Sequence, residues 1–144
     1  MKIKEIKEYQ PEILDAVVKL SIQLTGKEML IGKAHLEALI SDQNSHLFLA
    51  LNDEGIILGM VTVGFYISPT GKKGWIEDVV VDQRFRGQGI GKNLTSFAIE
   101  FAKNQQADMV MLTSKPARIS ANNLYKKLGF QLRETNVYRI LLNQ

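Results

Sequence analysis

Residues 79–103 constrain the fold most, because an apolar strand, a basic glycine-rich turn and an amphipathic helix follow one another there. The β-branched run 79–81 ends at Asp82. Beyond Gly89, apolar residues recur at helical spacing, which predicts a helix with one buried face. The residues of that face are Ile90, Leu94, Phe97, Ala98, Phe101 and Ala102. The predicted helix therefore begins at the glycines.

The turn between this strand and this helix predicts an anion-binding site. The first N–H groups of a helix have no partner within the helix, and the macrodipole places partial positive charge on them. Glycine has no Cβ, so a ligand can approach the main chain closely. Arg84, Arg86 and Lys92 add full positive charges nearby. The stretch favours a phosphate or pyrophosphate; the alternative is a basic, flexible turn that only caps the helix.

Two common phosphate-binding motifs do not fit the spacing. The dinucleotide fingerprint requires glycine at its first, third and sixth positions, but counting from Gly87 gives Gly89 and then Lys92. A Walker loop requires glycine five residues before its Gly-Lys pair, where this chain has Arg86. It also requires Ser or Thr after the lysine, where this chain has Asn93. The spacing excludes both the Rossmann and the nucleotide triphosphatase interpretations.

The run Arg86-Gly-Gln-Gly-Ile-Gly91 fits the pattern Arg/Gln-x-x-Gly-x-Gly/Ala, and here the chain resembles the GNAT superfamily of acyl-CoA-dependent N-acetyltransferases. The frame that begins at Arg84 also fits; the later frame is preferred because its glycines lie at the helix entry. The resemblance implies that acetyl-CoA is the cofactor and that loop amides hold its pyrophosphate. The cofactor-binding residues expected on this basis are Val79, Val80, Val81, Arg84, Arg86, Gly87, Gln88, Gly89, Ile90, Gly91, Lys92, Ser114, Arg118 and Asn122.

Length and composition predict a single cytoplasmic domain over residues 1–144, with 45% hydrophobic and 23% charged residues. The chain has no cysteine and only two histidines, so we expect no metal site and no thiol nucleophile. A net charge of +3 without a long basic stripe is not typical of nucleic-acid binding. Apolar runs are too short to span a membrane, and the N-terminus lacks a signal-peptide pattern. We therefore expect neither nucleic acid nor membrane as a partner.

The remaining periodicity predicts a mixed α/β (α+β) fold. Segment 107–113 follows a crossover, which makes it parallel to segment 74–82. Gly59 and Gly64 interrupt a strand and suggest a bulge. This order resembles the GNAT fold: a central mixed, mostly antiparallel sheet of about six to seven strands with a parallel central pair and about four flanking helices. Strands are expected at residues 1–9, 46–52, 56–67, 74–82, 107–113, 130–132 and 137–142, and helices at 11–25, 33–41, 90–103 and 118–128.

Acyl transfer to an amine requires a neutral amine, a group that holds the oxyanion and a proton for the leaving thiolate. Deprotonating an amine with a pKa near 10.4 at pH 7 costs about 4–5 kcal/mol of free energy. A nearby carboxylate that accepts the proton offsets this cost. Glu77 is the first candidate base, directly or through water, because it is an acid within an apolar strand; Asp78 is the second. Strand alternation puts Glu77 on the face of Val79 and Val81, opposite Val80. The alternative is a strand-end carboxylate that is solvated or paired.

Main-chain N–H groups along residues 78–81 are expected to hold the oxyanion if the strand bulges or splays there. The resemblance implies this, because members of the family bind the thioester carbonyl between two parallel strands that diverge. The proton donor implied by the resemblance is Tyr125. Its segment, residues 121–130, resembles the GNAT pattern Asn-x-x-Ala-x-x-Phe/Leu-Tyr-x-x-x-Gly-Phe. A phenol with a pKa near 10 can protonate a thiolate whose conjugate acid has a pKa near 8.5. The alternative is a tyrosine that packs on the apolar face of its helix.

The chain departs from the family pattern at Arg118, which stands where the pattern has Asn, seven residues before the tyrosine. Arg118 and Lys115 are expected to contact cofactor phosphates or an anionic acceptor, or else to be solvated loop charges. Ser114 and Asn122 are further polar candidates.

The resemblance implies an N-acetyltransferase that moves an acetyl group from acetyl-CoA to a primary amine by direct attack in a ternary complex. The alternative is a non-catalytic acyl-CoA-binding sensor or interaction module. The acceptor, a small-molecule or protein amine, cannot be read from the sequence, although loop 24–33, the hairpin tips and the C-terminal strands are expected to select it. Family analogy also points to a homodimer formed through the C-terminal strands.

Overall fold

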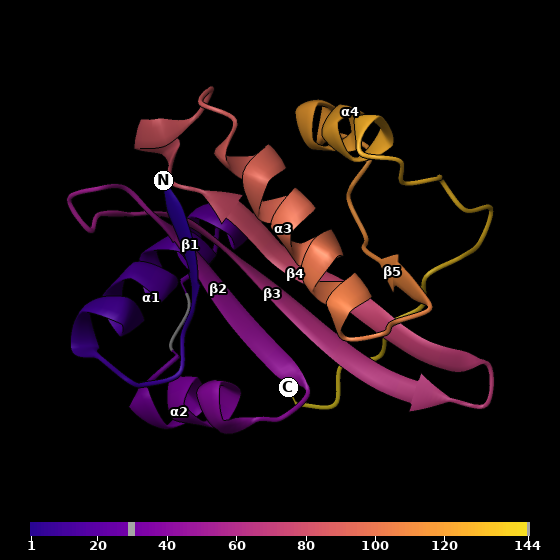
Figure 1. Ribbon diagram of the computed structural model, residues 1–144, viewed down its shortest axis with the longest axis horizontal. Helices are drawn as coiled ribbons and strands as arrows, with labels where there is room; N and C mark the ends of the chain where they lie inside the picture. The colour runs from indigo at the N-terminus through magenta and orange to yellow at the C-terminus, as the bar shows by residue number, and fades with distance from the viewer. Residues whose placement is uncertain (29–30, 144) are drawn as a thin grey trace. The chain divides into compact units, whose positions relative to one another are not determined.

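The computed structural model describes residues 1–28 and 31–143. Five strands in these residues form one sheet in the order β1-β2-β3-β4-β5 (Figure 1). The pairs are antiparallel except β4 with β5, which is parallel, as predicted. The elements are β1 (Lys2–Glu5), α1 (Pro11–Thr25), α2 (Lys33–Ser41), β2 (Ser45–Leu51), β3 (Ile57–Ser68), β4 (Gly71–Val81), the 3₁₀ turn η1 (Gln83–Phe85), α3 (Ile90–Asn104), β5 (Met109–Met111) and α4 (Ile119–Lys127).

The chain divides into two compact units, Met1–Thr113 and Ser114–Gln144. The first unit contains the whole sheet together with α1, α2 and α3. The second unit contains α4 and the C-terminal segment. The loop expected to influence acceptor choice, residues 24–33, belongs to the first unit, and its positions 29 and 30 lie outside the described residues.

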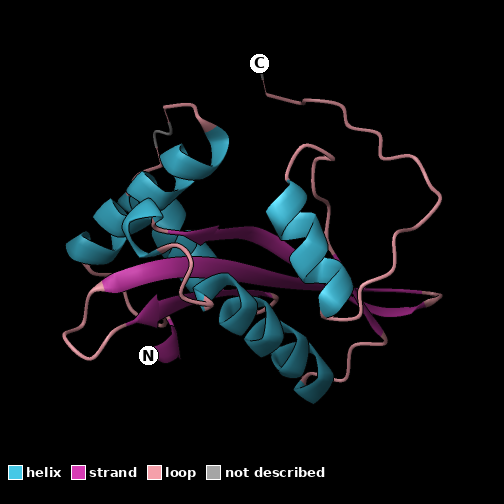
Figure 2. Ribbon diagram, turned by 90° about the horizontal axis from the view of Figure 1, so that it is seen from above, coloured by secondary structure: helices cyan, strands magenta, loops and turns pink. Residues whose placement is uncertain are grey.

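The sheet of the first unit is covered on both faces. Figures 1 and 2 show α3 on one face and α1 with α2 on the other. Alternation along β2 supplies both cores, since Leu47 and Leu49 pack with α1 and α2, whereas the Phe48 ring lies 4.8 Å from the Phe101 ring of α3. Leu94 of α3 is fully buried. The predicted amphipathic helix therefore packs on the sheet directly behind the glycine-rich turn.

Gly59 of β3 lies close to another backbone, as the glycines within this predicted strand suggested. A Cβ at Gly59 would stand 2.7 Å from the carbonyl oxygen of Val80. The β2–β3 register also shifts beside it, between Ala50 and Leu51. Strand β3 therefore approaches β4 closely just before the turn.

The predicted strands at residues 130–132 and 137–142 are wrong for the described residues, so the sheet has five strands rather than six to seven. A strand is stable only when its backbone groups pair with a neighbour. In residues 131–143 the one backbone hydrogen bond between described residues runs from the Thr135 N–H to the Arg133 carbonyl. The apolar side chains of this segment are accordingly exposed: Leu132, Val137, Tyr138, Ile140, Leu141 and Leu142.

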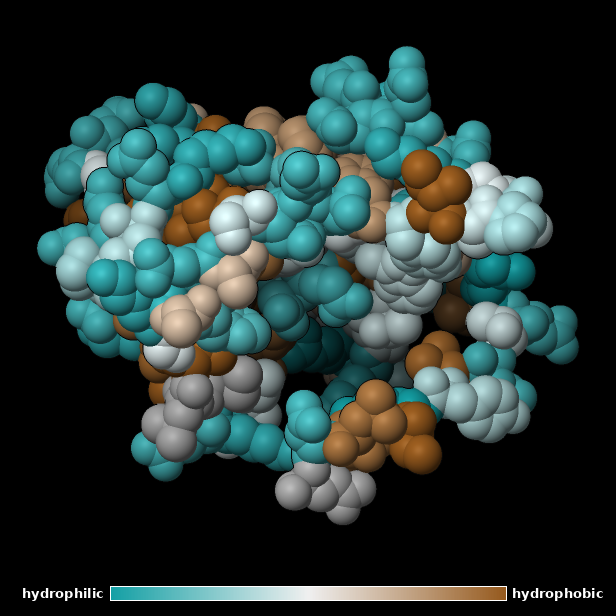
Figure 3. Space-filling model, turned by 90° about the horizontal axis from the view of Figure 1, so that it is seen from below, coloured by the Kyte–Doolittle hydropathy of each residue, from teal (hydrophilic) through white to brown (hydrophobic). Residues whose placement is uncertain are grey.

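One face of the molecule, shown in Figure 3, is mostly hydrophilic, with hydrophobic residues in several separate groups. None of the described helices has the length and apolar character required to cross a bilayer.

Candidate functional site

The turn between β4 and α3 is organised by local hydrogen bonds. The Asp82 carboxylate accepts from the backbone N–H of Arg84 at 2.9 Å and so caps η1, an element that the sequence did not predict. The Arg84 guanidinium donates to the same carboxylate, with Nη2 at 2.7 Å from Oδ2. This ion pair lowers the pKa of Asp82, chiefly through the side-chain hydrogen bond from Arg84. Arg84 is therefore held by Asp82 instead of extending freely toward the turn.

Gly87 and Gly89 both adopt left-handed backbone conformations, with φ of 79° and 77°. L side chains disfavour this region, so the backbone itself requires glycine at both positions. A Cβ built at either glycine meets no atom within 4 Å. The space around the turn is therefore open to a ligand.

The N-terminus of α3 lies at these glycines, as predicted. Gly89 is the N-cap and provides no side-chain hydrogen bond to the helix. The first helical hydrogen bond runs from the Asn93 N–H to the Gly89 carbonyl at 3.0 Å, which leaves the N–H groups of Ile90, Gly91 and Lys92 without a partner among the described residues. Unpaired amides at a helix N-terminus, together with the helix dipole, are an arrangement that favours anion binding.

Two cationic residues flank this helix end in the chain. Arg86 and Lys92 are exposed, and neither makes an ion pair with a described residue. Free amides, open space and two uncommitted cations together fit a diphosphate group. Gln88 is also exposed within the turn.

Strand β4 bulges at the candidate base, which confirms the condition set for the oxyanion site. Thr62 of β3 pairs with Glu77 and Met60 pairs with Val80, so two β4 residues oppose one β3 residue. Within the bulge Asp78 has a φ of 53°, which is unusual for any residue other than glycine.

The bulge overturns the predicted alternation of faces. Residues paired across an antiparallel sheet lie on the same face. Thr62, the partner of Glu77, and Met60, the partner of Val80, both lie on the face that α1 and α2 cover. Glu77 and Val80 therefore share that face. The sequence had placed Glu77 and Val80 on opposite faces. One extra residue in the strand shifts the pattern, and the local sequence does not reveal it.

The other edge of β4 is open next to this bulge. β5 pairs only with residues 73–75 of β4, so no described strand continues that pairing to Val81. The Asp82 N–H donates to Leu58 of β3 at 2.8 Å, and the Val81 carbonyl of the same trans peptide points the opposite way. The Val81 N–H shares that outward edge. Next to the bulge this edge of β4 is therefore not paired with a described strand, although the Val81 carbonyl on it accepts a hydrogen bond from the Gln23 side chain.

Glu77 and Asp78 are both exposed at this bulge. The pKa of Glu77 is raised, first by partial burial and then by the negative charge of Asp78. A carboxylate with a raised pKa is a stronger base than an ordinary one.

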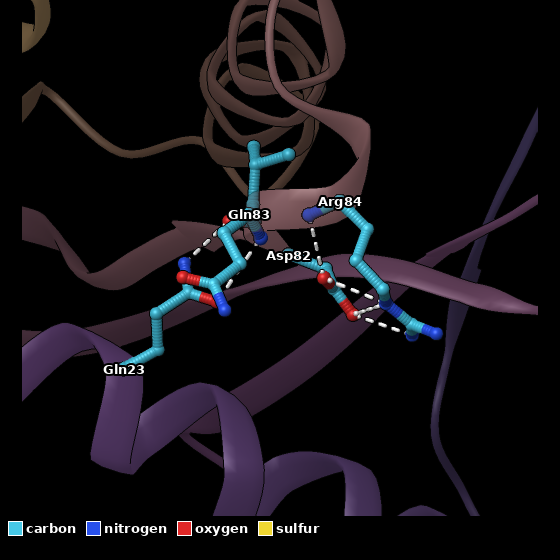
Figure 4. Close-up of polar contacts among 5 residues, drawn as sticks. Gln23, Asp82, Gln83 and Arg84 are labelled. Atoms are coloured by element: carbon cyan, nitrogen blue, oxygen red, sulfur yellow. Dashed lines mark hydrogen bonds and ion pairs between the residues drawn. The ribbon is translucent and has the colours of Figure 1, made fainter.

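Sequence reasoning missed Gln23, whose side chain joins α1 to this turn (Figure 4). Its Nε2 donates to the Val81 carbonyl at 2.7 Å, and its Oε1 accepts from the Gln83 N–H at 3.1 Å. In the sequence Gln23 is one polar residue on an amphipathic helix, 58 residues from Val81, so no motif indicates this contact.

Four predicted site residues belong to the second unit. Tyr125 lies on α4, and its pKa is raised, first by burial, while the Arg118 charge acts in the opposite direction. Asn122 donates through Nδ2 to the Lys115 carbonyl at 2.9 Å and so secures the loop before α4. The buried Ser114 Oγ has no hydrogen-bond partner among the described residues, so its capacity to form a hydrogen bond is unused.

The described residues contain no group of three or more His, Cys, Asp or Glu side chains arranged to hold a metal ion.

The chain is similar to known acetyltransferases in sequence. The model of the acetyltransferase (GNAT) family matches residues 18–130. The N-alpha-acetyltransferase 30 of Saccharomyces cerevisiae is 33% identical over 72 residues, which are 50% of this chain and 40% of that protein. The aminoalkylphosphonate N-acetyltransferase of Salmonella typhimurium is 28% identical over 135 residues, which are 91% of this chain and 87% of that protein.

The fold is also similar to a solved acetyltransferase. The crystal structure of an aminoglycoside acetyltransferase from an uncultured soil metagenomic sample matches with a TM-score of 0.85 at 20% identity, covering 99% of this chain and 96% of that one. This likeness shows the fold alone. The chain spans less than two thirds of the length of the yeast N-alpha-acetyltransferase 30 proteins it matches. Because the family model covers most of its length, the chain belongs to the GNAT family of acetyltransferases.

Proposed function

We propose that this protein transfers an acetyl group from acetyl-CoA to a primary amine by direct attack in a ternary complex. The observation that carries the proposal is the uncapped N-terminus of α3 directly after the free edge of β4. Together these supply peptide N–H groups for an anion and for an extended ligand. Acetyl-CoA, when bound, supplies an acyl group activated as a thioester.

In this proposal the amides of residues 87–92 bind the pyrophosphate, and Arg86 and Lys92 neutralise its charge. The outward-facing N–H of Val81, and that of Val79 at the bulge, hold the extended part of the ligand or the oxyanion, whereas the N–H of Val80 faces β3 like that of Asp82. Support comes from the two left-handed glycines, which leave the turn free of Cβ atoms.

Glu77 is the proposed base that takes a proton from the attacking amine, directly or through water. Its raised pKa supports this role, because a base is most effective when its pKa approaches the working pH. Asp78 is the second candidate, since both carboxylates are exposed at the bulge.

Tyr125 is the proposed donor of the proton that the leaving sulfur receives. Burial raises its pKa, so the phenol keeps its proton at neutral pH and is available as an acid. The family resemblance of its segment supports the assignment. Ser114, Arg118 and Asn122 are proposed contacts to the cofactor, and the unpartnered Ser114 hydroxyl is the strongest support among them.

A primary amine as acceptor is supported by the names of the relatives, which include an aminoalkylphosphonate N-acetyltransferase. Self-association through residues 131–143 is part of the proposal too, because this segment exposes several large apolar side chains that a second copy would cover.

The direct test is thiol release from acetyl-CoA in the presence of panels of small amines and of peptides with free N-termini. Release that depends on both acetyl-CoA and an amine supports the proposal. The alternative, a non-catalytic acyl-CoA sensor or interaction module, predicts CoA binding by calorimetry without thiol release from any amine. No binding of CoA at millimolar concentration would contradict both.

A further inference from the structure

One side chain of α1 contacts the backbone on both sides of Asp82. Gln23 donates from Nε2 to the Val81 carbonyl at 2.7 Å and accepts at Oε1 from the Gln83 N–H at 3.1 Å (Figure 4). A single planar amide thus holds the last residue of β4 and the first residue of η1. Asp82, which lies between them, caps η1 through the Arg84 N–H.

These backbone groups have no other described partner. The Val81 carbonyl faces the edge of β4 that β5 does not reach. The Gln83 N–H belongs to the first turn of η1, where backbone donors have no partner within the helix. Without Gln23, both groups would be released to water, and the direction of the chain at the end of β4 would be less restricted.

The helix that carries Gln23, α1, is fixed by its packing in the core. Val17 and Leu20 of α1 are buried in the core that α1 forms with the sheet. The helix ends in a closed cap, with the Gly26 N–H donating to the Ile22 carbonyl at 2.8 Å. Gln23 therefore connects the fixed position of α1 to a turn whose other side-chain hydrogen bonds run within the turn, between Asp82 and Arg84.

We infer that Gln23 is a positioning residue for the pyrophosphate-binding turn, an inference that rests on the proposed function. It does not contact the proposed ligand amides of residues 87–92. It keeps the chain that leads into them in one conformation. When only part of the population is binding-competent, the apparent dissociation constant rises by the reciprocal of that fraction. Loss of the Gln23 contacts is therefore expected to weaken binding and not to slow the chemical step.

The first test uses the protein without ligand. Gln23→Met preserves the length of the side chain but removes both hydrogen bonds. Gln23→Glu keeps an acceptor for the Gln83 N–H and loses the donor to Val81. Hydrogen exchange at the Gln83 amide should become faster in Gln23→Met and remain close to wild type in Gln23→Glu. Asp15→Ala, an exposed change in the same helix, is the control and should leave this exchange unchanged.

The second test measures binding and turnover. Calorimetry should show CoA affinity reduced about five- to tenfold in Gln23→Met, as expected for the loss of one or two ordinary hydrogen bonds. The KM for acetyl-CoA should rise similarly, with kcat within about twofold of wild type, because the effect is on binding. Gln23→Glu should also bind CoA more weakly, because its added negative charge repels the phosphates. Salt screens this repulsion, so part of the loss in affinity should disappear at high ionic strength.

Each result bears on a different claim. If wild type binds CoA and Gln23→Met binds it equally well, the inference fails and the proposed function stands. Unchanged exchange at Gln83 in Gln23→Met would equally overturn the inference, as would a loss confined to kcat. If wild type does not bind CoA, both the proposed function and the inference fail.

Discussion

The turn after β4 and the C-terminal segment 131–143 are both irregular backbone, but they differ in what holds them. The turn is bonded to β3 through Asp82, to α1 through Gln23 and within itself through the Asp82 cap. The C-terminal segment has one backbone hydrogen bond among the described residues, and its apolar side chains are exposed. A ligand site needs fixed backbone donors, and the first region supplies them.

The same contrast explains what the sequence predicted and what it did not. The turn and α3 were predictable because their signals are local: glycines at the helix entry, nearby cations and a helical apolar period. Residues 137–142 also carry a strand pattern, but a strand requires a partner, which no local pattern specifies. The bulge at Asp78 and the contact of Gln23 with Val81 depend on residues distant in sequence, so they were not predictable.

The largest expected effect is at Tyr125 on α4, and Tyr138 in the C-terminal segment provides the matched control. Tyr125→Phe should reduce kcat about a hundred- to a thousandfold, since a positioned proton donor contributes on that order. CoA affinity should be preserved. Tyr138→Phe, the same change at an exposed position, should leave turnover unchanged. Steady-state kinetics of both variants test this, and equal activities would remove Tyr125 from the mechanism.

Glu77→Gln should lower kcat/KM about a hundredfold. Because the pKa of Glu77 is raised, the wild-type rate should fall with decreasing pH at values above the ordinary carboxyl pKa of 4.5. That limb of the pH profile should disappear in the variant. Glu54→Gln, in the exposed β2–β3 hairpin, is the matched control.

Glu77 should also affect stability in a defined direction. A folded-state pKa above the unfolded value means that stability is lost as pH rises through the folded pKa, when the carboxylate ionises. Glu77→Gln is therefore expected to be slightly more stable than wild type at neutral pH. Thermal unfolding at several pH values measures this, and a variant less stable at pH 7 would contradict the assigned shift.

Gly89→Ala tests the turn itself. Alanine at a φ of 77° should lower the free energy of unfolding by about 1 kcal/mol, and CoA affinity should fall about tenfold because the helix entry shifts. Gly55→Ala is a matched control, with a φ of 81° and equally open surroundings in a hairpin. It should show the same loss of stability with unchanged CoA affinity. Equal CoA affinities for the two variants would mean that the glycine turn does not bind CoA.

The smallest expected effect is in the C-terminal segment. Leu142→Ala should change the free energy of unfolding by less than about 0.5 kcal/mol at low protein concentration, because the side chain is 87% exposed. The same change at the fully buried Leu94 of α3 should cost about 2–5 kcal/mol. Denaturant unfolding compares the two. A large loss for Leu142→Ala would mean that this segment packs against a partner.

The central claim is that the amides at the N-terminal end of α3 bind a diphosphate. Titration of ¹⁵N-labelled protein with CoA, followed by amide resonances, tests it most directly. We expect the largest shifts at residues 87–92, and no such shifts with pantetheine, which lacks the phosphates. Shifts of the same size with pantetheine, or CoA shifts confined to other parts of the chain, would contradict the claim.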